Sequence, residues 1–150
     1  MALSEKRRQE INRRVDLTGD FLIKTHLSTR EIAEHFSDNS DIYFKASHVS
    51  ISDYVKKYIM KYPEKENLIK DILDENKGSS LNQERILKRI NDAYAFLEQG
   101  LNFEEIAYKL SESYWVIYYD IHLRLRKLDN HRYKIAKEFI KNNQKNKNKK

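Results

Sequence analysis

The sequence contains no cysteine, one proline and only three glycines among its 150 residues. Without cysteine, neither a disulfide scaffold nor a thiolate metal site can form, which fits a reducing cytoplasm. The scarcity of glycine and proline leaves few breaks in the chain, so we expect an all-α protein. The charged N-terminus lacks the apolar segment of a secretory signal, and the longest aromatic-apolar run, residues 114–119, is too short to span a bilayer. We therefore expect a cytoplasmic protein with no membrane partner.

Motifs of catalysis are also lacking. The five histidines are scattered, and the sequence has no H-E-x-x-H pair, no glycine-rich phosphate loop and no nucleophile elbow. The paired carboxylates at Glu104 and Glu105 are better explained as helix caps and dipole partners than as an acid–base pair. We expect neither an enzyme, nor a metal site, nor a cofactor.

Positive charge is present in excess, but only in the second half of the chain. The net charge is +6, whereas residues 1–77 carry 14 basic and 14 acidic side chains and residues 78–150 carry 15 and 9. Five of the lysines fall within residues 141–150, which contain no acid. Such a tail is as typical of a solubility feature as of a phosphate-binding arm, so the charge favours nucleic-acid binding only modestly.

An internal repeat is the strongest signal in the sequence. Residues 27–36 read L-S-T-R-E-I-A-E-H-F, and residues 101–110 read L-N-F-E-E-I-A-Y-K-L, 74 positions later. Each copy lies between two longer amphipathic segments, and each places a small residue, Ala33 or Ala107, inside a short capped helix. A short capped helix between longer ones is typical of a helix-turn-helix. The repeat therefore predicts two tandem helix-turn-helix units of about four helices each.

The predicted boundaries follow from caps and breakers. We expect a first unit at residues 1–77, a linker at 78–80, a second unit at 81–142 and a basic disordered tail at 143–150. In the first unit, Ser4 should cap a helix over residues 5–25, and Ser28 and Glu31 form a capping box. After a loop over residues 37–48, Ser50 should cap a third helix, which Pro63 ends.

The second unit follows the same plan more compactly. Asn82 is predicted to cap its first helix and Gly100 to end it, Asn102 and Glu105 form the second capping signal, and Ser113 caps the next helix. Residues 117, 121 and 125 then match residues 54, 58 and 62 at an offset of 63. Set against the 74-residue repeat, this offset places eleven extra residues in the turn of the first unit.

A family resemblance rests on several of these segments. Residues 49–64, V-S-I-S-D-Y-V-K-K-Y-I-M-K-Y-P-E, with N-L-I-K-D-I-L-D-E-N-K after them and R-E-I-A-E-H-F before them, resemble the stage III sporulation protein D family. The second unit is similar to the same pattern from I-A-Y-K-L-S-E-S to K-E-F-I-K-N-N, with Ser111 in place of the family's turn glycine. The resemblance implies a DNA-binding transcription regulator associated with the nucleoid.

Matching each unit to the family pattern gives the expected DNA-binding residues. N-terminal residues of a recognition helix meet base edges. These positions are Ser50, Ile51, Ser52, Val55 and Lys56 in the first unit, and Ser113, Tyr114, Trp115, Tyr118 and Tyr119 in the second. The basic side chains placed for phosphates are Lys56, Lys57, Lys61, Arg124, Arg126 and Lys127. None of the base-edge positions holds Arg, Asn or Gln, so direct sequence readout should be weak.

The aromatic residues 114, 115, 118 and 119 leave a second interpretation open. They form two adjacent rows of a helix face, which can pack inside the unit, contact a protein partner or a second copy of the chain, or stack on bases. The sequence thus supports two functions, a DNA-binding regulator and a non-enzymatic, all-helical protein-interaction module derived from a helix-turn-helix fold.

Overall fold

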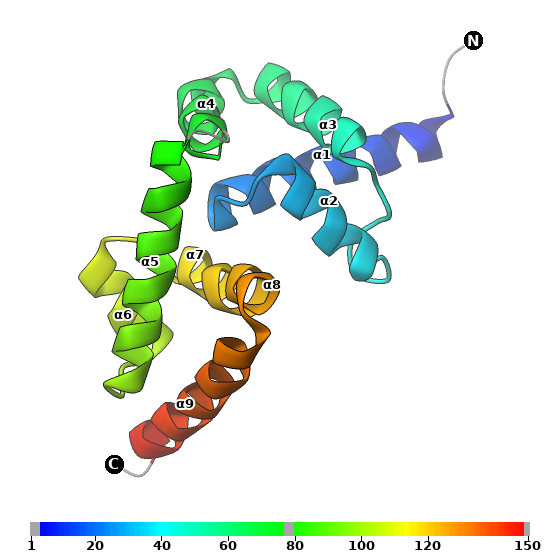
Figure 1. Ribbon diagram of the computed structural model, residues 1–150. Coiled ribbons are helices and arrows are strands. Elements are labelled where there is room, and N and C mark those ends of the chain that lie inside the picture. Colours follow the sequence, from blue (N-terminus) through cyan, green and yellow to red (C-terminus); the bar gives the residue numbers. More distant parts are fainter. Residues whose placement is uncertain (1–3, 77–79, 149–150) are drawn as a thin grey trace. The chain divides into compact units, whose positions relative to one another are not determined.

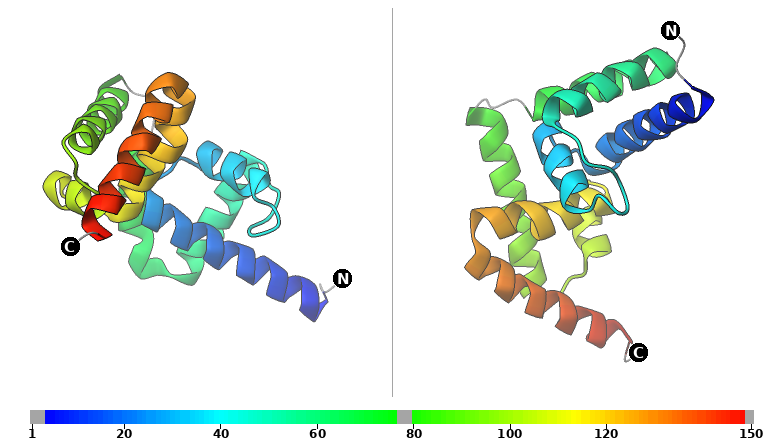
Figure 2. Two further views of the ribbon diagram at one scale, coloured as in Figure 1. Left: turned by 90° about the horizontal axis from the view of Figure 1, so that it is seen from below. Right: turned by 90° about the vertical axis from the view of Figure 1, so that its right-hand side faces the viewer.

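The computed structural model describes the backbone of residues 4–76 and 80–148, and the side chains of residues 4–76 and 82–144. Its regular structure within these residues is entirely helical, which confirms the predicted all-α class (Figures 1 and 2). The chain divides into two compact units, unit 1 at Met1–Lys77 and unit 2 at Gly78–Lys150. Of the predicted linker, residues 78 and 79 lie outside the described residues, and Ser80 begins a helix.

Unit 1 is built on α3, against which both preceding helices pack (Figure 1). Its elements are α1 (Glu5–Thr25), α2 (Thr29–Asp38), α3 (His48–Lys61), the short 3-10 turn η1 (Pro63–Lys65) and α4 (Glu66–Glu75). Two caps are confirmed: the Ser4 side chain accepts from the Arg7 amide, and Ser28 and Glu31 form a complete capping box. Pro63 ends α3 as predicted, and the chain turns through η1 before α4 begins.

The start of α3 differs from the prediction. Ser47, not Ser50, is the N-cap, and its Oγ accepts a hydrogen bond from the Ser50 amide at 3.2 Å. The stretch reads S-H-V-S, so two serines compete for the cap, and the one that leaves Ile51 and Val55 facing the core is used. The predicted loop is correspondingly shorter, because α2 continues to Asp38.

Tyr58 fills the centre of unit 1 against a glycine. The ring is fully buried, and its hydroxyl donates to Asp20 Oδ1 at 2.6 Å and accepts from Lys65 Nζ at 2.9 Å. A Cβ atom on Gly19 would lie 2.1 Å from the Tyr58 ring. The absence of a side chain at position 19 therefore lets α1 and α3 approach closely. On α4, Ile69 and Ile72 take the buried positions, whereas Leu68 is 46% exposed.

Unit 2 contains one long helix with a π-helical segment in its middle. Its elements are α5 (Ser80–Glu98), α6 (Phe103–Leu110), α7 (Tyr114–Tyr119), the π-helical segment η2 (Asp120–Leu125), α8 (Arg126–Leu128) and α9 (Asn130–Asn148). Because α7, η2 and α8 follow one another directly, residues 114–128 form one continuous helical stretch. The predicted start of the first helix at Asn82 is wrong, since α5 already includes Ser80.

The turns of unit 2 follow the predicted capping chemistry. Gly100 has φ 98°, and the amides of Gly100 and Leu101 donate to Leu97 O and Phe96 O, the Schellman pattern of a helix C-terminus. Asn102 and Glu105 form a capping box, and the Ser113 side chain accepts from the Val116 amide. All three predictions are confirmed.

The core of unit 2 is lined by residues four apart. Ile117, Ile121 and Leu125 are fully buried and pack in a cluster that includes Ala107 and Ala136. A π-helical turn holds more residues than an α-helical turn, so side chains spaced by four drift less around the axis. The π-helical segment thus keeps this row directed at the core.

The predicted disordered tail is wrong for residues 143–148. Helix α9 continues to Asn148, and the buried Asn143 side chain donates from Nδ2 to Leu97 O at 3.1 Å and to Leu101 O at 2.8 Å. Asn143 therefore satisfies carbonyls at the end of α5, a function that apolar periodicity does not reveal. Residues 149 and 150 lie outside the described part. No described helix is both long and apolar enough to cross a membrane.

We expect Gly19→Ala to lower the free energy of unfolding by about 1–3 kcal/mol, the usual cost of overpacking. The added methyl group must displace the Tyr58 ring, which is held by Asp20 and Lys65. Urea denaturation of the full chain measures the change. Asn12→Ala, on the exposed side of the same helix, is the control and should stay within about 0.5 kcal/mol of the parent protein; an equal effect of both substitutions would contradict the close approach.

Candidate nucleic-acid interface

The turn between α6 and α7 holds the two helices close together. Residues 111–113 connect them, and Ser111 adopts φ 54°, the left-handed conformation usual for a turn glycine. The Glu112 amide donates to Ala107 O at 2.9 Å, which closes the end of α6. Ala107 is only 6% exposed, so its small side chain lies within the packed interior, as the repeat predicts.

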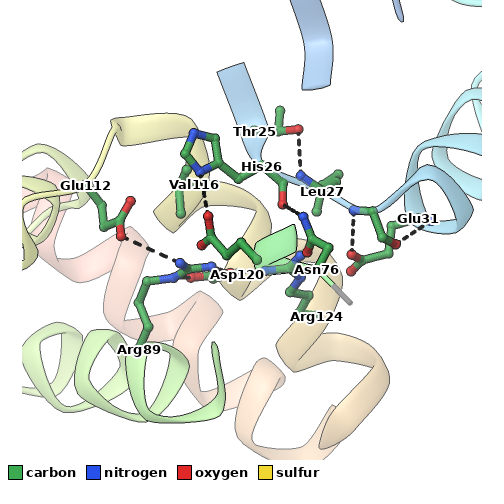
Figure 3. Close-up of polar contacts among 12 residues, drawn as sticks. Thr25, His26, Leu27, Glu31, Asn76, Arg89, Glu112, Val116, Asp120 and Arg124 are labelled. Atoms are coloured by element: carbon green, nitrogen blue, oxygen red, sulfur yellow. Dashed lines mark hydrogen bonds and ion pairs between the residues drawn. The ribbon is translucent and has the colours of Figure 1, made fainter. Parts of the chain in front are cut away.

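A buried ionic cluster fixes the helix that follows this turn. Arg89 on α5 binds Asp120 with two hydrogen bonds, Nε to Oδ2 at 2.5 Å and Nη2 to Oδ1 at 3.0 Å. Arg124 Nη1 donates to the same carboxylate at 3.1 Å, and Arg89 Nη1 lies 3.6 Å from Glu112 Oε1 (Figure 3). Arg89 and Asp120 are 8% and 1% exposed. The cluster therefore joins α5, the turn and the π-helical segment.

This cluster removes negative charge from the surface of the long helix. Asp120 is the only acidic residue between positions 113 and 128. Because Asp120 is buried and paired with two guanidinium groups, the outward side of this helix carries no carboxylate. The same pairing corrects the role of Arg124: its side chain is 10% exposed and bound to Asp120, so it is not available to a phosphate.

The N-terminal part of the helix presents an aromatic surface. Tyr114 is 38% exposed, and Trp115 and Tyr118 are half-buried. The Trp115 ring lies 5.1 Å from Tyr114 and 5.4 Å from Tyr118, centroid to centroid. Tyr119 is 8% exposed, which contradicts the prediction that it contacts DNA; its ring lies 5.1 Å from that of Tyr118, centroid to centroid. The aromatic surface therefore consists of residues 114, 115 and 118.

His122 packs against the aromatic surface on its side facing the interior of unit 2. Its ring lies 4.5 Å from Tyr118 and 5.6 Å from Phe103, and Nδ1 lies 2.9 Å from the Tyr133 hydroxyl. Burial lowers the pKa of His122, and the nearby Lys137 and Arg126 act in the same direction. A neutral imidazole therefore anchors the aromatic residues at neutral pH. Beyond it, Arg126 and Lys127 are exposed, as predicted.

Unit 1 presents a different set of residues from the one predicted. Ile51 and Val55 are 0% and 3% exposed and belong to the core, so the prediction that they contact DNA is wrong. Ser50 is half-buried in the first turn of α3, where it bonds to Ser47, and Ser52 is half-buried. The exposed residues of the first turn are His48 and Val49, which the sequence analysis missed.

The DNA-contacting residues of unit 1 were predicted incorrectly because the sequence of unit 1 was aligned on that of unit 2 with a shift of three residues. The cap pair Ser28 and Asn102 lies 74 residues apart, whereas Ser47 and Ser113 lie 66 apart, not 63. Ile51 and Ile117, both fully buried, obey the same offset of 66. The first unit thus holds eight extra residues in its turn rather than eleven. A test of which serine leaves the apolar row facing inward would have revealed the shift.

The lysines of α3 fall into two groups. Lys61 is bound to Asp16, with Nζ 2.9 Å from Oδ2, so its charge is already matched and the predicted phosphate contact is not favoured. Hydrogen bonding to Asp16 also raises the pKa of Lys61. Lys56 and Lys57 are exposed and have no ion pair within the part of the chain that the structure describes. They remain available to an anionic partner.

Comparison with known protein families, with curated proteins and with solved structures gives no match. The family resemblance therefore stays a prediction. Within the described residues, no three His, Cys, Asp or Glu side chains gather where they could hold a metal ion.

We expect Asp120→Asn to lower the free energy of unfolding by about 3–5 kcal/mol, because it leaves Arg89 and Arg124 buried beside a neutral amide. Chemical denaturation followed by circular dichroism measures this loss. Asp92→Asn is the matched control: Asp92 pairs with Lys88 at 3.1 Å on the exposed side of α5 and should cost less than about 1 kcal/mol. Similar losses in both variants would mean that the buried cluster has no special role.

Proposed function

We propose that this chain is a non-enzymatic regulator that binds duplex DNA through helix-turn-helix units. The observation that carries the proposal is the outward side of residues 114–128, which combines aromatic and basic side chains with no exposed carboxylate. A polyanion can approach such a helix without repulsion. The capped helix before it, the turn at Ser111 and the buried Ala107 agree with the arrangement in which a second helix enters the major groove.

The positions of the side chains along residues 114–128 support a helix that enters the major groove with its N-terminal end. Tyr114 and Trp115 lie in the first turn, where a recognition helix meets base edges. Arg126 and Lys127 follow after twelve residues, roughly 18 Å along a helix. The major groove is about 12 Å wide, so the basic pair reaches the phosphates at its edge while the aromatic end lies within it.

The side chains available favour weak sequence discrimination. Ser113 and the tyrosine hydroxyls can bond to any base, and no Arg, Asn or Gln lies in the first turn for a bidentate contact. Electrostatic contacts with phosphates should therefore supply most of the affinity. In unit 1, His48, Ser52 and Lys56 are proposed as the corresponding surface.

A second function is favoured by exposed apolar residues. Met60 is 80% exposed and Val49 is 58% exposed on α3, and Tyr108 on α6 is 88% exposed. Exposed apolar and aromatic side chains are typical of protein contacts. The alternative proposal is a protein-interaction module whose partner is another protein or a second copy of the chain.

We expect the full chain to bind duplex DNA with an affinity that falls steeply between roughly 50 and 200 mM salt, because each phosphate contact releases counterions. Fluorescence anisotropy with labelled genomic duplexes measures the slope. The plot of log affinity against log salt has a negative slope, and the double variant Arg126→Ala/Lys127→Ala should reduce its magnitude by about 1–2. Lys134→Ala/Lys137→Ala, in which both substitutions lie on the exposed side of α9, is the control. No binding at low salt would sink the DNA proposal.

Trp115→Ala separates the two functions. If the aromatic surface lies on DNA, the substitution should reduce affinity for duplexes by about 5- to 150-fold, which corresponds to the loss of about 1–3 kcal/mol for a stacked aromatic contact. The oligomeric state, measured by sedimentation, should not change. Unchanged DNA affinity together with lost self-association would instead support the protein-interaction module. Thermal unfolding of the variant reports whether the fold is retained.

A further inference from the structure

Unit 1 contains a basic groove that the sequence analysis did not identify. It lies between the N-terminal half of α1 and the middle of α3 and has a volume of about 540 Å³. The residues of the groove that matter here are Lys6, Arg7, Glu10, Arg14, Tyr54 and Lys57. Four of these six residues are cationic, and they come from two helices that are far apart in sequence.

Three of the cationic side chains have no partner of their own. Lys6, Arg7 and Lys57 are exposed and form no ion pair within the described residues. Cationic groups that repel one another across a groove gain nothing for the fold, in contrast to Lys61, whose charge is matched by Asp16 at 2.9 Å. An anionic ligand would relieve this repulsion.

Among the described residues that line the groove, Glu10 is the only acid, and its charge is already matched. Glu10 Oε1 lies 2.8 Å from Arg13 Nη2 and 3.0 Å from Arg14 Nε. Hydrogen bonds from Arg13 and then Arg14 lower the pKa of Glu10 to about 2. Because two guanidinium groups share one carboxylate, the negative charge of Glu10 is fully compensated and does not oppose an anion in the groove.

Arg14 and Tyr54 form an ordered floor. The Arg14 guanidinium carbon lies 4.8 Å from the centre of the Phe44 ring, and Phe44 packs edge-on against Tyr54 with centroids 5.6 Å apart. Hydrogen bonding with Tyr54 and Glu10 raises the pKa of Arg14. A side chain held in this way loses little further conformational entropy when it binds an anion.

We propose that this groove binds the phosphodiester backbone of duplex DNA, as a contact surface of unit 1 that is separate from the long helix of unit 2. The inference rests on the proposed DNA-binding function. Lys6 and Arg14 lie eight residues apart, roughly 12 Å along α1. That span exceeds a single phosphate and suits a strand that carries one charge about every 3.4 Å of its axis.

The test compares two triple variants of the full chain that change its net charge equally. The groove variant is Lys6→Ala/Arg7→Ala/Lys57→Ala, and the control is Lys24→Ala/Lys45→Ala/Lys70→Ala, whose side chains are exposed elsewhere in unit 1. We expect the groove variant to reduce the magnitude of the negative slope of log affinity against log salt by about 2–3. The control variant should reduce it by less than about 1. The charge-preserving variant Lys6→Arg/Arg7→Lys/Lys57→Arg should retain the parent slope and verifies that charge at these positions is what matters.

Equal losses in the groove and control variants would overturn the proposal, since net charge alone would then explain binding. Binding to phosphatidylserine vesicles but not to duplex DNA would also overturn it. The variant Arg126→Ala/Lys127→Ala distinguishes this inference from the proposed role of unit 2. If Arg126→Ala/Lys127→Ala binds DNA like the parent protein and the groove variant binds more weakly, the groove proposal is supported and the proposed role of the long helix is wrong. If Arg126→Ala/Lys127→Ala binds more weakly and the groove variant binds like the parent protein, only the groove proposal is wrong.

Discussion

The ionic contact between Arg89 and Asp120 is the constraint on which the architecture of unit 2 depends. A buried carboxylate is costly unless it is paired, and here two arginines share it while Glu112 approaches the first of them. The contact links α5 to the π-helical segment and to the turn before α7. It also leaves the outer side of the long helix without negative charge, so one interaction serves both the packing and the electrostatics of the proposed interface.

Unit 1 depends on a steric fit between α1 and α3. Gly19 admits the Tyr58 ring, and Asp16 and Asp20 bind the Lys61 ammonium group and the Tyr58 hydroxyl. These contacts place Lys57 beside the N-terminal half of α1, where the basic groove forms. The even charge of residues 1–77 therefore conceals a local separation. Asp16 and Asp20 join α1 to α3, whereas the cations Lys6, Arg7 and Lys57 gather at the basic groove.

Local signals predicted the helices well and the site less well. The caps at Ser4, Ser28, Asn102 and Ser113 and the glycine turn at Gly100 depend on hydrogen bonds within a few residues, so they are legible in the sequence. The site required the alignment of one unit on the other. A choice of Ser50 instead of Ser47 as cap shifted that alignment by three residues and assigned two core residues, Ile51 and Val55, to the surface.

The sequence by itself determined that this protein is helical and where most of its helices begin and end. Tertiary structure alone decided which charges are free. Arg124 and Lys57 look alike in the sequence, yet one binds a buried carboxylate and the other lines an open groove. The reason is physical: a cap or an apolar row is decided by residues within a turn or two, whereas the availability of a charge depends on partners that the fold brings from 31 or 45 residues away, as with Arg89 and Asp120 or Asp16 and Lys61.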